Sequence, residues 1–167
     1  WISPTVVSGT LANQAISASA TTPNIYQLLP GTPSTGEYFL IENRQPGNYD
    51  ASVPGTGLLI WHVDASKASN DAECFPGGPS CATAHYKIAV VPADNLFNLE
   101  RNQNRGDAGD PWPGSAGSTN FGATSTPNSS LYSGAPSGVS VTAISASAAV
   151  MTATLSGLDN TAPDTTI

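Results

Sequence analysis

Two runs of sequence decide the fold: GEYFLIENRQ at residues 36–45 and GLLIWHVD at residues 57–64. Each run is rich in aromatic and branched side chains, begins with a glycine and ends in polar residues, which is the pattern of a buried strand. Apolar residues occupy both alternating faces of the first run, so this strand requires cover on both sides. We therefore expect the two runs at the centre of the fold, with the rest of the chain packed on them.

Further strand patterns occur at residues 25–29, 86–91, 138–144 and 150–155. In the last two, apolar residues alternate with Ser or Thr, which predicts an antiparallel C-terminal β-hairpin within residues 138–156, at the edge of the core. Asp94 is placed to cap one or two helical turns, the only helix that we expect. Long Gly/Pro/Ser-rich stretches predict long loops. The expected fold class is mostly β, with an antiparallel or mixed sheet core of about seven strands.

The length of 167 residues suits one domain,. We expect a single β-rich domain over residues 1–158, followed by a Pro/Thr linker at residues 159–167 that leads to a further module. The chain begins on Trp1 and Ile2, a pair typical of the middle of a core element. We therefore expect that it was cut from a longer polypeptide.

The composition is poor in charge and acidic. Charged residues make up 10% of the chain, against about 25% in an average domain,. The net charge of −7 and only five Lys and Arg argue against a nucleic-acid partner, which requires a basic surface,. No apolar run reaches the roughly 18 residues of a membrane span. An acidic, hydroxyl-rich chain of this kind suits a secreted, extracellular protein.

The few charges are concentrated in the middle of the chain. Residues 1–36 and 111–158 contain no Asp, Glu, Lys or Arg, whereas the section at residues 37–110 holds all five bases, both His and both Cys. If the chain has chemistry, this section holds it.

The two cysteines, Cys74 and Cys81, flank the Pro/Gly-rich segment FPGGPS. Such a loop can bring its ends together, which favours a local disulfide. The alternative is a soft metal site, but a second Cys pair is missing and only His85 is near in sequence. A disulfide also agrees with an extracellular location.

Several segments carry a resemblance to a known family. The segments at residues 36–45 and 54–64, then GDAGDPWPG at residues 106–114, PNS at 127–129 and GV at 138–139, occur in the same order in the immune inhibitor A family of secreted bacterial zinc metallopeptidases. The chain resembles the part of these proteins that lies C-terminal to their catalytic motif. That motif, His-Glu-x-x-His with a third histidine, does not occur around His62 or His85, and Met151 lies in an alternating strand.

The resemblance implies a non-catalytic C-terminal portion of a secreted zinc metalloendopeptidase that supports the catalytic half. No hydrolytic activity is expected from this chain alone, and zinc belongs only to the missing catalytic half. The implied partner is another polypeptide, either that catalytic half or an assembly partner. The alternative is an extracellular surface-binding or structural β module, used for adhesion, glycan contact or assembly.

Asp107 and Asp110 form the candidate calcium site. Calcium takes several oxygen ligands, and two carboxylates on a glycine-rich loop can turn inward together with main-chain carbonyls. The alternative is a pair of Asx turns that organise the loop.

A polar cluster on the two central runs is a second candidate. His62 and Asp64 point to the same side of their strand, and a metal or acid/base role would need a third partner, either His85 or Glu42. The alternative is a strand-end histidine held by one hydrogen bond. Glu42 and Arg44 also share a face, where we expect a semi-buried polar pair rather than a catalytic carboxylate.

Three aromatic residues, Trp61, Trp112 and Tyr132, are candidates for contact with a carbohydrate. Flat aromatic faces stack on sugar rings. The alternative is that these side chains anchor the glycine-rich loops to the core.

Overall fold

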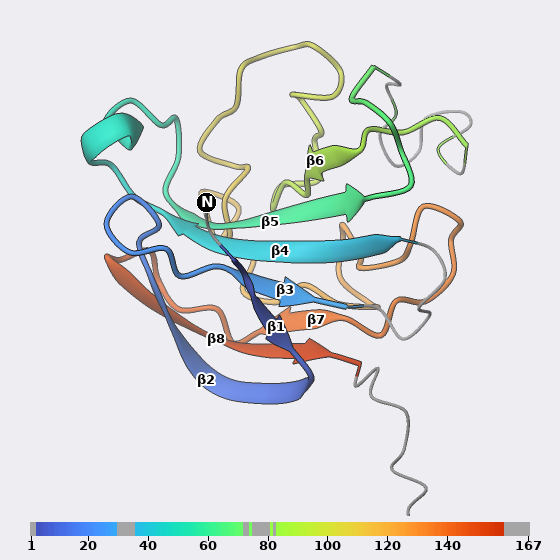
Figure 1. Cartoon of the computed structure of the whole chain (residues 1–167). Coiled ribbons are helices and arrows are strands. Elements are labelled where there is room, and N and C mark those ends of the chain that lie inside the picture. Colours follow the sequence, from blue (N-terminus) through green and yellow to red (C-terminus); the bar gives the residue numbers. More distant parts are fainter. Residues whose placement is uncertain (1–2, 30–35, 72–73, 75–80, 82, 159–167) are drawn as a thin grey trace, which may run out of the picture.

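The computed structural model describes residues 3–29, 36–71, 74, 81 and 83–158, and it confirms a mostly β fold. Figure 1 shows two sheets, one above the other. The first has the order β1-β3-β4-β5-β6 and comprises β1 (Thr5–Val7), β3 (Tyr26–Leu28), β4 (Glu37–Arg44), β5 (Gly57–Asp64) and β6 (Ile88–Val90). The second has the order β2-β8-β7 and comprises β2 (Gly9–Ser17), β8 (Val150–Gly157) and β7 (Ser140–Thr142).

The predictions for Trp1 and for the linker at residues 159–167 lie outside the described residues. Within the described part, the helical content is one 3-10 turn, Asn48–Asp50. No helix there has the length and apolar character to cross a bilayer.

The two apolar runs at residues 36–45 and 57–64 become β4 and β5, at the centre of the larger sheet. They pair antiparallel, with Ile41 opposite Ile60 and Glu37 opposite Asp64. β3 pairs antiparallel with β4, and β6 pairs antiparallel with β5. Because β1 pairs parallel with β3, the sheet is mixed. The predicted central position of the two runs is confirmed.

The expectation of cover on both faces of the first run is wrong for one face. Phe39 and Ile41 are fully buried, whereas Tyr38 and Leu40, on the opposite face, are only half-buried. The reason is that the second sheet packs on one face of the first sheet only (Figure 1).

The second sheet is larger than a C-terminal hairpin. β7 and β8 pair antiparallel, but β8 also pairs along its length with β2, which comes from the start of the chain. β8 is therefore the middle strand of its sheet and not an edge. The chain passes from β1 in one sheet to β2 in the other through Gly9, whose φ of 78° favours glycine,.

One hydrophobic core lies between the sheets and draws on both of them, from Val7 in β1 to Leu155 in β8.

A buried amide also joins the layers. Asn43, on β4, is fully buried, and its Nδ2 donates to the carbonyl of Ile16 at 2.9 Å and to that of Ala148 at 3.0 Å. Because buried polar groups are costly without partners, this side chain favours one alignment of the two sheets.

The helix expected after Asp94 does not form. Asn95 and Phe97 have φ angles of 60° and 52°, which a right-handed helix does not contain,. The Asp94 carboxylate accepts a hydrogen bond from the Leu96 N–H at 2.9 Å. Asp94 therefore organises a turn instead of capping a helix.

Candidate functional site

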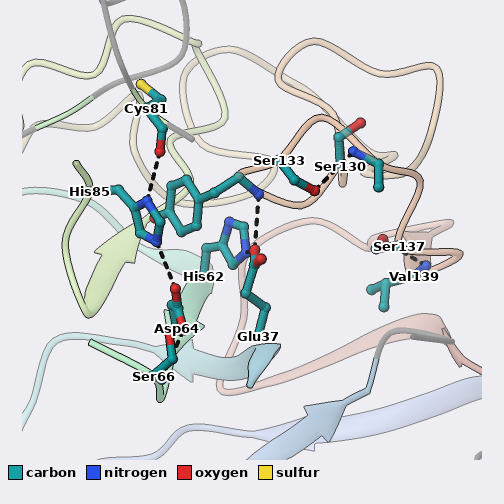
Figure 2. Close-up of polar contacts among 12 residues, drawn as sticks. Glu37, His62, Asp64, Ser66, Cys81, His85, Ser130, Ser133, Ser137 and Val139 are labelled. Atoms are coloured by element: carbon teal, nitrogen blue, oxygen red, sulfur yellow. Dashed lines mark hydrogen bonds and ion pairs between the residues drawn. The ribbon is translucent and has the colours of Figure 1, made fainter. Parts of the chain in front are cut away.

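Two carboxylate–histidine pairs lie at one end of the β4–β5 hairpin (Figure 2). The antiparallel register sets Glu37 opposite Asp64, on the inner face that also carries His62. Glu37 Oε2 lies 2.8 Å from His62 Nε2, and Asp64 Oδ2 lies 2.7 Å from His85 Nε2. All four residues are buried.

Tyr132 lies between the two imidazole rings. Its ring centroid is 4.1 Å from that of His62 and 3.6 Å from that of His85, with nearly parallel planes in both cases. Phe39 stacks on His62 at 4.4 Å, and the main-chain N–H of Tyr132 donates to Glu37 Oε2 at 2.9 Å. These four rings form what we call the ring stack, Phe39-His62-Tyr132-His85, which joins the central hairpin to two long loops.

Both ring nitrogens of His85 have oxygen partners. His85 Nδ1 lies 2.7 Å from the carbonyl of Cys81, and its Nε2 lies 2.7 Å from Asp64 Oδ2. Because a carbonyl and a carboxylate are both acceptors, the imidazole ring is held from two sides. Burial opposes the charged form of Asp64, but hydrogen bonds from Ser66 and His85 outweigh it and hold the pKa of this carboxyl below its usual value,.

The other ionisable members of the stack are held neutral. Burial lowers the pKa of His62 despite its hydrogen bond to Glu37,. Burial also raises the pKa of Tyr132, and the charges of Glu37, Glu100 and Asp64 raise it further. His62 therefore favours the uncharged imidazole, which fits its position between two apolar rings.

The structure answers the question of a third partner for His62 and Asp64. His85 joins Asp64, as one alternative supposed, whereas Glu42 lies on the opposite face of β4. Glu37, and not Glu42, is the carboxylate that contacts His62. Glu37 was not among the site residues predicted from the sequence. The signal available was the hairpin register, because matching residue 41 with residue 60 sets residue 37 opposite residue 64. Among the described residues, no group of three His, Cys, Asp or Glu is placed to hold a metal.

Glu42 and Arg44 form the polar pair expected from the sequence. Arg44 Nε lies 3.5 Å from Glu42 Oε1, which also accepts a hydrogen bond from Trp61 Nε1 at 3.0 Å. Arg44 Nη1 contacts Asp50 at 3.0 Å. The pair fastens the outer face of the hairpin to the 3-10 turn.

The three candidate aromatic residues do not share a surface. Trp112 is fully buried, and its Nε1 donates to the carbonyl of Val91 at 2.9 Å. The prediction that Trp112 contacts a carbohydrate is therefore wrong, and the side chain anchors a loop to the core instead. Trp61 lies on the outer face of β5, and Tyr132 belongs to the ring stack on the inner face.

The disulfide Cys74–Cys81 is confirmed, with Cα atoms 5.3 Å apart. The six residues between the two cysteines lie outside the described part of the chain. The disulfide borders the ring stack, because the main-chain carbonyl of Cys81 lies 2.7 Å from His85 Nδ1.

Asp107 and Asp110 turn toward main-chain N–H groups. Asp107 Oδ1 accepts from the N–H of Gly109, and Asp110 Oδ2 accepts from the N–H of Asp107, both at 2.7 Å. Asp107 Oδ2 accepts from Asn98 and Asn104. The Gly109 and Asn98 hydrogen bonds lower the pKa of Asp107, whereas burial raises that of Asp110. These contacts are those of turn-forming residues.

Calcium at Asp107 and Asp110 stays a prediction. An ion bound only to the folded state stabilises it by about 2.7 kcal/mol at a hundredfold excess over its dissociation constant. We expect the chain to melt at a higher temperature in millimolar calcium than in chelator, as followed by circular dichroism. The double variant Asp107→Asn, Asp110→Asn should remove this difference. Identical melting of the native chain in both buffers would leave the two carboxylates as turn formers only.

Comparisons with protein-family models, with curated proteins and with solved structures return no significant match.

Proposed function

We propose that this chain is the non-catalytic C-terminal portion of a secreted zinc metalloendopeptidase, of the immune inhibitor A kind that its sequence resembles. In this role it supports the catalytic half, which supplies the zinc and the hydrolytic chemistry. The observation that carries the proposal is that the segments of the resemblance pack on one another and build the fold.

The central hairpin and the segment at residues 106–114 meet through main-chain contacts. Leu58 and Trp112 exchange two N–H to carbonyl hydrogen bonds, each 2.8 Å long. Gly57, with a φ of 146°, lies where a Cβ would collide with the Trp112 carbonyl, which explains the glycine,. This part of the resemblance therefore holds a loop against the sheet.

The last two segments of the resemblance also meet. Ser129 is buried, and its hydroxyl donates to the carbonyl of Val139 at 2.7 Å. Val139 is itself part of the core between the sheets. Residues that serve as packing junctions in this way suit a supporting role rather than a catalytic one.

The histidines have structural partners. His62 and His85 are each held by a carboxylate and by the rings of the stack, which ties loops far apart in sequence to the hairpin. A buried imidazole ring with an oxygen partner at each nitrogen, as in His85, is a fixed element of the fold and not a group poised to leave it for a metal,. The confirmed disulfide is consistent with the extracellular location proposed for the parent enzyme,.

The proposal predicts that the purified chain does not hydrolyse protein. We expect no release of fluorescent peptides from labelled casein, with or without added zinc, because the sequence lacks the His-Glu-x-x-His motif. A second experiment expresses the catalytic half with and without this chain. We expect the two to elute together in gel filtration, and the catalytic half to lose activity or solubility when this chain is left out. Clear zinc-dependent cleavage by the chain alone would overturn the proposal.

A surface-binding or structural β module is the second candidate, favoured by the low charge of the chain, 10% of its residues. The gene sequence upstream of Trp1 distinguishes the two. A His-Glu-x-x-His motif there supports the peptidase, and its absence supports the module.

A further inference from the structure

A cavity of about 270 Å³ lies beside the ring stack. β5 and β6 contribute His62 and Val90 to its wall, and the loops that follow contribute Phe97, Glu100, Leu131 and Tyr132. The disulfide borders it as well. This volume is close to the lower limit of small-molecule sites, roughly 300 Å³, so the occupant is a small molecule or a single side chain.

One carboxylate in the cavity wall stands out. Glu100 is 5% exposed, and its carboxylate accepts a hydrogen bond from its own main-chain N–H. Burial raises the pKa of Glu100, and the charge of Asp110 raises it further,. A carboxylate can accept several hydrogen bonds, so this single one leaves acceptor sites for a ligand, and a buried acid in the wall of a cavity indicates a binding site.

The electrostatics of the cavity favour a cation. The five basic residues of the chain, Arg44, Lys67, Lys87, Arg101 and Arg105, are all missing from the described residues that line it. His62 favours its neutral form, so Glu100 is the group that determines the charge of the wall. An anion would meet a carboxylate with no compensating positive charge.

The remaining wall suggests the shape of the cation. Val90, Val91, Phe97 and Leu131 offer apolar surface that suits an alkyl chain,. An ammonium has three hydrogens to donate, and Asn95, Asn128 and Ser130 line the same cavity with amide and hydroxyl oxygens,. A single carboxylate suits this compact charge better than the planar fork of a guanidinium, which pairs best with two oxygens held in its plane.

We propose that this cavity binds a primary alkylammonium group, with the Glu100 carboxylate as its counter-ion and the apolar wall around its methylene groups. Two sources carry this chemistry: a free aliphatic amine and the lysine side chain of another polypeptide. The inference is independent of the proposed function, since it uses only the cavity and its charge.

The test uses isothermal titration calorimetry on the full chain at pH 7.5. Cadaverine represents the free amine, and a short peptide with one central lysine represents the protein source. The same peptide with its lysine Nε-acetylated is the neutral control. We expect saturable binding of at least one amine and at least tenfold weaker binding of the acetylated peptide. Preference for cadaverine or for the lysine peptide identifies the source.

Variants assign the binding to the cavity. Glu100→Gln should weaken binding of the amine at least tenfold and should melt at the same or a higher temperature than the native chain, because it removes a buried negative charge that no cation of the cavity wall offsets,. Glu42 is a buried acid on the opposite face of the hairpin, so Glu42→Gln is the matched control and should leave binding unchanged. Glu100→Asp, which withdraws the carboxylate by one methylene, should also weaken binding.

Two results would overturn the proposal. One is the failure of the native chain to bind either amine at millimolar concentration. The other is equal affinity of the native chain and the folded Glu100→Gln variant. Neither result depends on whether the chain supports a peptidase, which the casein and gel-filtration experiments test separately.

Discussion

Replacing Trp112 with alanine should lower the free energy of unfolding by about 3–5 kcal/mol, the largest effect that we expect from one substitution. Among the described residues, Trp112 is the largest fully buried side chain; it packs edge to face on Phe121 with ring centroids 5.5 Å apart, and it is hydrogen-bonded to Val91. Its removal leaves a cavity and a buried carbonyl without its donor. Since domains are stable by only about 5–15 kcal/mol, much of the total would be lost.

Urea denaturation followed by circular dichroism measures this loss. Trp61→Ala is the control, because Trp61 has the same side chain but lies half-buried on the outer face of β5. We expect the Trp61 variant to lose clearly less stability. Equal losses for the two variants would show that Trp112 does not anchor the core.

The second large effect concerns the buried Asp64–His85 pair in the ring stack. Asp64→Ala should destabilise the fold by about 3–5 kcal/mol, because it removes one partner of a buried carboxylate–histidine pair and leaves His85 Nε2 without its acceptor,. Asp64 is 4% exposed, and it also holds Ser66 through two hydrogen bonds. Asp64→Asn keeps the shape and the acceptor for Ser66, so a smaller loss is expected from it.

This pair also predicts how stability depends on pH. The pKa of Asp64 is lower in the folded chain than its unfolded value of 3.8, so the unfolded chain takes up the proton first as the pH falls,. The stabilisation from Asp64 is therefore complete above pH 3.8 and is lost as the pH falls through the folded-state pKa. Denaturation curves between pH 2 and 6 should show this loss in the native chain and a weaker one in Asp64→Asn. Parallel pH profiles would contradict the assignment.

Some features of the protein follow from local sequence. Continuous apolar runs that begin with a glycine predict the central strands at residues 36–45 and 57–64, and alternation of apolar and polar residues with a period of two predicts the strands within residues 138–156. The spacing of Cys74 and Cys81 around a Pro/Gly segment predicted the disulfide. The shared face of Glu42 and Arg44 predicted their contact. Each of these is a relation between residues near one another in the chain.

Only the tertiary structure decided which faces cover each other. Alternation shows that a face is buried but not what buries it, so the pairing of β2 with β8, from opposite ends of the chain, left no local signal. The ring stack likewise depends on a loop that brings Tyr132 between His62 and His85. Glu100 is an ordinary surface residue in sequence, and it becomes a buried carboxylate in a cavity wall only because distant segments close around it. Sites of this kind arise from contacts between segments far apart in the chain, which no periodicity encodes.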